Sequence, residues 1–158
     1  MITNTTLSAL RALLHLGHHS PTLIPPRRIA EELGESPTYM SKVTTQLVKA
    51  GVLRAERGAK GGVQLAKPPG EITLLDVVRA CQGEIVGGYC RSVCEPELVC
   101  AFHSAAEQLE RAIVESLERW TLRDLLERPR AAGEVELAFP CAMVGPAQVG
   151  VRKPADGS

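Results

Sequence analysis

Apolar residues recur every three or four positions over residues 4–18, which predicts an amphipathic helix. The same spacing predicts two shorter helices over residues 27–33 and 37–49. Pro26 suits the first turn of the first of these helices, and Ser36 and Pro37 suit the N-cap and the first position of the second. Gly34 ends the first of these two helices and Gly51 follows the second, because glycine tolerates the left-handed backbone at a helix end. Two short helices around a tight glycine turn are typical of a helix-turn-helix.

Two strands are predicted next, over residues 52–57 and 63–66, joined by the glycine-rich loop 58–62. A hairpin directly after a helix-turn-helix is a wing, and its glycines would let the backbone approach a phosphate groove. Arg57 and Lys60 would bring positive charge to it. The predicted fold class is therefore mainly α, a winged helix-turn-helix with a two-stranded wing and a long C-terminal dimerisation helix.

A long helix is predicted over residues 98–120, because its apolar residues form one stripe. Such a helix would span about 34 Å. Its stripe needs a partner, and a second copy of the chain is the simplest one. The alternative is that the helix packs back on its own domain. The stripe consists of Phe102, Ala105, Leu109, Ala112, Ile113, Leu117 and Trp120.

Two further helix starts are marked by threonine and aspartate three residues apart. Thr73 and Asp76 begin a helix that runs through Cys81, and Thr121 and Asp124 begin a short final helix. We therefore expect four segments: a winged helix-turn-helix domain at 1–81, a cysteine-containing loop at 82–97, the dimerisation helix with the short final helix at 98–128, and a disordered tail at 129–158.

The formal net charge is zero, but the charges are unevenly spread. Residues 1–67 hold nine Lys/Arg and four Asp/Glu, whereas residues 68–128 hold six and eleven. A basic first part and an acidic middle suggest a polyanionic partner for the first part alone, although ordinary charge scatter is an alternative. No secretory signal or membrane span is visible, so we expect a cytoplasmic protein. In that reducing compartment the five cysteines favour metal or redox chemistry over structural disulfides.

The outer face of the second helix of a helix-turn-helix enters the major groove of DNA. Here that face carries hydroxyl groups that suit base edges and a lysine that suits phosphate. Arginines at the start of the preceding helix also suit a phosphate. The alternative for any single residue is an ordinary solvated polar face. The candidate DNA-contacting residues are Arg27, Arg28, Ser36, Thr38, Tyr39, Ser41, Lys42, Thr45, Arg57 and Lys60.

Cys90, Cys94 and Cys100 are followed closely by His103. Thiolates are soft ligands that select zinc, copper(I) or iron–sulfur clusters, and a histidine can complete a zinc or a cluster site. Spacing alone does not distinguish among zinc, copper(I) and an iron–sulfur cluster. The alternative to a metal site is three free thiols.

The remaining cysteines and histidines suggest no further site. Cys81 falls on the inner side of its helix and is expected in the core, and Cys141 lies in the tail and receives no role. Of His15, His18 and His19, we expect two at the surface and one in packing, because no thiol or carboxylate spacing joins them.

Several segments together resemble the Rrf-two family of winged-helix regulators, over roughly residues 1–128. The family folds as a homodimer that binds a pseudo-palindromic operator. The segments that carry the resemblance are SPTY at 36–39, LVKAGVL at 47–53, RGxxGGVxLA at 57–66, ITLLDVV at 72–78 and TLRDL at 121–125.

The resemblance also implies a cofactor. Cys90, Cys94 and Cys100 match the cluster-binding cysteines of the family, and His103 matches the histidine ligand of its iron–sulfur assembly regulators. Those regulators hold a [2Fe–2S] cluster, whereas the family's nitric-oxide sensors hold [4Fe–4S] with an N-terminal carboxylate. Leu7 stands at the carboxylate position here, so [2Fe–2S] is favoured. The first cysteine spacing is three residues instead of the family's usual five, so [4Fe–4S] stays an alternative.

The leading hypothesis is a homodimeric regulator, a repressor, whose DNA binding depends on an iron–sulfur cluster that senses redox state, nitric oxide or iron–sulfur status. The alternative is a metal-free thiol switch that joins Cys90 and Cys94 in a disulfide. A cluster carrier is disfavoured by the wing and recognition helix. An enzyme is disfavoured because the sequence contains no nucleophile–base pair or phosphate loop.

Overall fold

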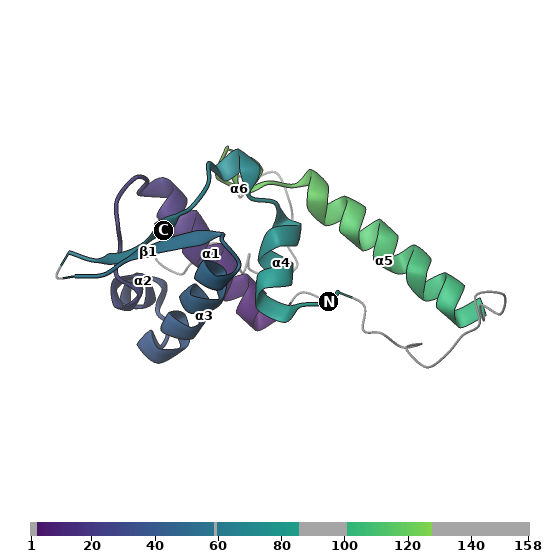
Figure 1. Cartoon of the computed structure of the whole chain (residues 1–158), viewed down its shortest axis with the longest axis horizontal. Coiled ribbons are helices and arrows are strands. Elements are labelled where there is room, and N and C mark those ends of the chain that lie inside the picture. The colour runs from purple at the N-terminus through teal and green to yellow at the C-terminus, as the bar shows by residue number, and fades with distance from the viewer. Residues whose placement is uncertain (1–2, 59, 86–100, 128–158) are drawn as a thin grey trace, which may run out of the picture.

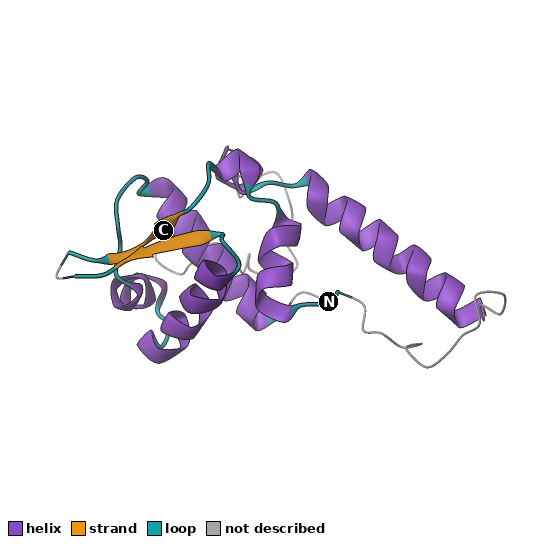
Figure 2. Cartoon of the chain, viewed as in Figure 1, coloured by secondary structure: helices purple, strands orange, loops and turns teal. Residues whose placement is uncertain are grey.

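The computed structural model describes residues 3–58, 60–85 and 101–127. Helices make up most of this part of the chain, together with one two-stranded sheet (Figure 1; Figure 2). The predicted fold class is confirmed. In chain order the elements are α1 (Asn4–His18), α2 (Pro26–Leu33), α3 (Pro37–Lys49), β1 (Leu53–Glu56), β2 (Gly62–Leu65), the 3-10 helix η1 (Pro69–Glu71), α4 (Leu74–Gln82), α5 (Ala101–Arg119) and α6 (Leu122–Glu127).

The turn between α2 and α3 forms as its glycine predicts. Gly34 has a φ of 67°, and its N–H donates to the carbonyls of Ala30 and Glu31 at the end of α2. Ser36 occupies the N-cap position of α3, but its hydroxyl makes no capping hydrogen bond. The backbone of the helix-turn-helix is thus set by the glycine and by the prolines in the first turns of α2 and α3.

The core lies where α1, α3 and α4 meet beside the sheet. It contains no Phe, Tyr or Trp among its fully buried residues in the described part of the chain, as the low aromatic content implies. Apolar positions on the inner faces of these helices are removed from water, which is the main stabilising contribution to the fold. The largest fully buried apolar side chains are Leu13, Leu16, Ile29, Met40, Val43, Leu47, Leu53, Ile72, Val77, Val78 and Leu122.

The wing is an antiparallel hairpin in which Leu53 pairs with Leu65 and Glu56 with Gly62. β1 is one residue shorter at each end than predicted, and β2 has the predicted length but begins and ends one residue earlier. A backbone bridge that the sequence did not reveal extends the hairpin. The N–H of Ile24 donates to the carbonyl of Val63 over 3.0 Å, and the N–H of Val63 donates back over 2.9 Å. The segment before α2 therefore holds the base of the wing.

Gly62 packs so closely against this bridge that a side chain does not fit. A Cβ atom at position 62 would lie 2.6 to 2.9 Å from the backbone C, O and N atoms of Ile24. Gly62→Ala is therefore expected to lower the free energy of unfolding by about 1–3 kcal/mol, because the backbone must shift. Chemical denaturation followed by circular dichroism measures the change.

Gly70→Ala provides the matched control for this variant. A Cβ at position 70 would meet only the end of the Arg123 side chain, which can move away. Equal losses of stability in the two variants would contradict the backbone-contact explanation. The close approach to Ile24 thus explains within the fold why position 62 is a glycine. This explanation is separate from the approach to phosphate that the sequence suggested.

α4 begins with the predicted capping box. The N–H of Asp76 donates to the Thr73 hydroxyl over 3.1 Å, and the Asp76 carboxylate accepts from the Thr73 N–H over 3.0 Å. Thr121 and Asp124 make the equivalent pair before α6, with the Thr121 N–H donating over 3.0 Å. Both predicted helix starts are confirmed.

α6 returns to the winged-helix domain. Thr73 and Thr121 form a backbone bridge, and the N–H of Leu122 donates to the carbonyl of Ile72 over 2.8 Å. The Leu122 side chain is buried in the core. The sequence interpretation grouped this short helix with the dimerisation helix, whereas its contacts are with α1 and η1.

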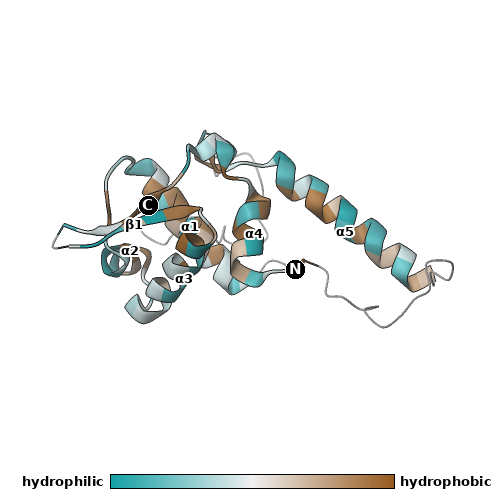
Figure 3. Cartoon of the chain, in the orientation of Figure 1, coloured by the Kyte–Doolittle hydropathy of each residue, from teal (hydrophilic) through white to brown (hydrophobic). Residues whose placement is uncertain are grey.

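α5 extends away from the winged-helix domain (Figure 1), and none of its residues is buried. Phe102, Leu109 and Trp120 on the predicted stripe are 61%, 57% and 43% exposed. Figure 3 shows apolar and polar residues alternating along this helix. Within the described residues the stripe takes no part in the hydrophobic core of the domain, although α5 contacts α4. No described helix combines the length and apolar character needed to cross a membrane.

Candidate DNA interface and metal-ligating residues

α3 presents an exposed polar face opposite the core. Thr38, Ser41, Lys42 and Thr45 all lie on it and are exposed, as predicted. The Ser41 hydroxyl donates to the carbonyl of Pro37 over 2.8 Å, and the Thr45 hydroxyl donates to the carbonyl of Ser41 over 2.7 Å. These hydroxyl oxygens keep lone pairs that can accept from a base edge or from water. This face therefore offers groups that could contact base edges and phosphate.

Tyr39 lies differently from the sequence expectation, which placed it on the outer face. Its ring is partly buried against the core, and its hydroxyl donates to the Thr5 hydroxyl of α1 over 3.2 Å. Tyr39 therefore links the first turn of α3 to α1. The sequence held a signal for this, since Tyr39 is four residues before the buried Val43 and shares its side of the helix.

Arg27 and Arg28 are exposed in the first turn of α2, where they were expected to meet phosphate. Each forms an ion pair one turn along the helix, Arg27 with Glu31 at 3.0 Å and Arg28 with Glu32 at 2.8 Å. Exposed pairs of this kind contribute little stability, roughly 0.3–0.5 kcal/mol. A phosphate can therefore compete for both guanidinium groups.

Arg57 and Lys60 lie at the tip of the hairpin, which projects from the domain beside α2 (Figure 1). Both are exposed, and neither forms an ion pair with any residue of the described segments. Ser36 is exposed at the start of α3. The wing tip and the face of α3 therefore offer positive and hydroxyl groups that are open to a polyanion.

Lys42→Ala is expected to weaken DNA binding by a similar factor on every sequence tested, because we expect Lys42 to contact phosphate, and phosphate contacts carry no sequence information. The slope of log affinity against log salt should fall by about one. Thr38→Ala and Ser41→Ala should instead relax specificity at one or two base positions. Fluorescence anisotropy titrations at several salt concentrations measure both effects. Unchanged affinity in all three variants would remove α3 from the interface.

A second cluster forms where α1 ends beside α2. His15 lies in the last turn of α1, His19 caps that helix, and Glu32 reaches them from α2. The Nε2 atom of His15 lies 3.2 Å from a carboxylate oxygen of Glu32. The expected division is confirmed, since His18 and His19 are exposed and His15 is half-buried. A carboxylate nevertheless joins the histidines, which local spacing could not reveal because Glu32 lies on another helix.

Burial and charge act on this cluster in opposite directions. Burial lowers the pKa of His15, and Glu32 only partly opposes this. The hydrogen bond from Arg28 lowers the pKa of Glu32, so its carboxylate is ionised at neutral pH. A neutral imidazole therefore faces a carboxylate.

The cysteine site is only partly visible. Cys90, Cys94, Cys100 and Cys141 lie outside the described residues. His103 is half-buried in the first turn of α5.

Cys81, the remaining cysteine, packs against the core from α4, where burial raises the pKa of its thiol. The inner position predicted for Cys81 is confirmed. A raised pKa keeps this thiol protonated and makes it a poor nucleophile.

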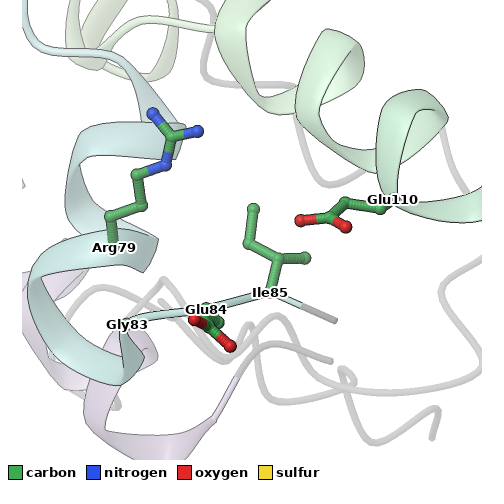
Figure 4. A pocket seen from close by; sticks show the side chains of 5 residues that line it. All are labelled: Arg79, Gly83, Glu84, Ile85 and Glu110. Atoms are coloured by element: carbon green, nitrogen blue, oxygen red, sulfur yellow. The ribbon is translucent and has the colours of Figure 1, made fainter. Parts of the chain in front are cut away.

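A pocket of about 380 Å³ lies between α4 and α5. Arg79 and Glu110 line its two sides, and Ile85 stands between them (Figure 4). Gly83 and Glu84 complete the lining as the chain leaves α4. This pocket lies at the junction between the winged-helix domain and the long helix, and it is lined in part by the first residues of the cysteine-containing loop 82–97.

Comparison with known sequences gives one family over most of the chain. Residues 2–128 match the family described as "Rrf2: Iron-dependent Transcriptional regulator". Among curated relatives, Protein aau3 of Rhizobium meliloti (strain 1021) is 31% identical over 134 residues, which cover 82% of this chain and 87% of that protein.

Two solved structures show the same fold. IscR of T. potens is 27% identical with a TM-score of 0.65, over 80% of this chain and 86% of that chain. The oxidized form of Staphylococcus aureus CymR is 26% identical with a TM-score of 0.64, over 83% of this chain and 99% of that chain. Both similarities extend beyond the helix-turn-helix to most of the chain.

Proposed function

The chain belongs to the Rrf2 family of DNA-binding transcriptional regulators, and we propose that it is a homodimeric repressor whose operator binding is controlled by an iron–sulfur cluster. The proposed ligands are Cys90, Cys94, Cys100 and His103. The family's description as iron-dependent and the similarity to IscR support a cluster. As a transcriptional regulator the chain is not an enzyme.

The donor set fits such a cluster. Thiolates hold iron–sulfur clusters, and an imidazole replaces a thiolate in some of them. The observation that carries the proposal is the position of His103 in the first turn of α5. A cluster bound there would lie at one end of the helix that carries the exposed apolar stripe. A bound cluster would supply a centre that responds to oxidants and to nitric oxide. [2Fe–2S] is favoured, since Leu7 offers no carboxylate ligand.

The long helix provides a route from the ligands to DNA. At its far end the carbonyl of Trp120 accepts from the N–H of Leu74 over 2.9 Å, which fixes this end to the winged-helix domain. A displacement of the first turn of α5 therefore changes how two domains are held in a dimer, and with it the separation of their recognition helices. A coupling of about 1–3 kcal/mol would change DNA affinity roughly 5- to 150-fold.

Anaerobic purification with an absorbance spectrum and iron and sulfide analysis tests the cluster. Cys94→Ala should abolish the chromophore and His103→Ala should alter it. Cys81→Ala, the matched control at a cysteine packed against the core, should retain the wild-type spectrum. A colourless protein without iron after reconstitution would contradict the proposal, and bound zinc that is lost in Cys94→Ala would indicate a structural zinc site at the cysteines. An identical spectrum for His103→Ala would require a different fourth ligand.

A metal-free thiol switch is the second candidate, and the similarity to a structure of CymR in an oxidized form favours it. Cys90 and Cys94 would lose two protons and two electrons to an oxidant such as hydrogen peroxide and form a disulfide. This candidate predicts a colourless protein whose DNA affinity changes with peroxide and recovers with dithiothreitol. Cys90→Ser should remove that response.

A further inference from the structure

We propose that His15, His19 and Glu32 form a binding site for a divalent transition-metal ion, with Zn²⁺ the best fit. The site lies on the winged-helix domain and uses none of the cysteines. Each residue offers one ligand atom, and these atoms lie within 4.8 Å of one another. They come from two helices, so a bound ion would join the end of α1 to α2.

The spacing of the ligand atoms suits a small tetrahedral ion. Two ligands at the usual zinc distances are about 3.4 Å apart in a tetrahedron. The Nε2 atom of His15 and the Oε2 atom of Glu32 are 3.2 Å apart. His19 is exposed and Glu32 is partly so, and small side-chain rotations can bring both to an ion held by His15.

The hydrogen bonding of His19 leaves one ring nitrogen able to bind a metal ion. Its Nδ1 atom lies 2.8 Å from the backbone carbonyl of His15, and a carbonyl can only accept, so Nδ1 carries the proton. Nε2 then holds the free lone pair. A histidine that donates one ring N–H to a backbone carbonyl while the other nitrogen binds metal is the usual arrangement in zinc sites.

His15 has a nitrogen that the described residues do not satisfy. Its Nε2 is buried and makes no hydrogen bond of acceptable geometry, although Glu32 is close. Buried polar atoms nearly always have a partner, so this nitrogen calls for an explanation. A metal ion between His15 and Glu32 would bind the lone pair and satisfy it.

Ligand chemistry selects the ion. Two imidazoles and one carboxylate suit zinc, with a water as fourth ligand, and do not suit the all-oxygen sites of magnesium and calcium. Arg28 binds the other carboxylate oxygen, Oε1 of Glu32, over 2.8 Å. That contact orients the carboxylate and leaves Oε2 toward the histidines, while its positive charge makes the site weaker than an isolated one.

The full-length chain with Cys90→Ser, Cys94→Ser and Cys100→Ser tests the site apart from the proposed cluster. Calorimetric titration with Zn²⁺ should give one ion per chain, and the melting temperature should rise with zinc, because an ion that binds only the folded state stabilises it. His19→Ala and Glu32→Gln in this background should weaken binding by about tenfold or more.

His18→Ala is the matched control, since His18 is an exposed neighbour on the same helix end and is not part of the cluster. It should bind zinc as the parent chain does. No zinc binding by the triple-serine chain would overturn the proposal. So would equal losses in the His18 and His19 variants, or binding that survives both His19→Ala and Glu32→Gln. None of these outcomes depends on a cluster being present.

Discussion

Leu109→Glu is expected to convert the proposed dimer into a monomer and to weaken operator binding about 10²- to 10⁴-fold. Leu109 lies in the middle of the α5 stripe and is 57% exposed in the single chain. If two stripes pack together, a carboxylate there must be buried without a partner, which is costly. A monomer then binds one half-site without the gain from a linked second half-site.

Analytical ultracentrifugation measures the first effect, and anisotropy on a DNA site selected by the wild-type protein from a random pool measures the second. Gln108→Glu is the matched control, because it adds the same charge to an exposed position on α5 outside the stripe. If Leu109→Glu stayed dimeric, the stripe would not be the dimer contact. A monomer with wild-type affinity would show that DNA binding does not require dimerisation.

The first three helices could be predicted from sequence nearly to the residue. Their ends are set by local chemistry: prolines in the first turns of α2 and α3, and Gly34 with its left-handed backbone. The same holds for the capping box of α4. Such signals act over three or four residues, so a single sequence contains them in full.

Contacts between distant segments could not be predicted in this way. The bridge between Ile24 and Val63 and the return of α6 to the core are long-range pairings. Periodicity shows that a helix has an apolar face but not which surface covers it. The contact between His15 and Glu32 is also long-range, because the two residues lie on different helices.

The two candidate sites also differ in how far local sequence could predict them. The exposed face of α3 followed from helical periodicity, apart from Tyr39, which sits at the border between the two faces. The cysteine site rests on residue types and on resemblance to a family, since its three cysteines lie outside the described residues. Spacing cannot choose the metal there, because zinc and iron–sulfur clusters accept the same donors.

Leu122→Ala is expected to lower the free energy of unfolding of the winged-helix domain by about 2–5 kcal/mol, the usual cost of emptying a fully buried leucine site. Leu122 is 1% exposed, and its N–H donates to the carbonyl of Ile72, a contact that alanine keeps. The loss would therefore come from side-chain packing alone.

Urea unfolding in the Leu109→Glu background measures this effect without a contribution from dimer dissociation. Arg123→Ala, one residue further along α6 and exposed, is the control and should stay within about 0.5 kcal/mol. A loss in Leu122→Ala as small as that of the control would mean that α6 serves the long helix alone. A loss in the expected range would mean that the chain returns from α5 to complete the core of the winged-helix domain. The long helix would then connect this domain at one end with the proposed cluster ligand His103 at the other.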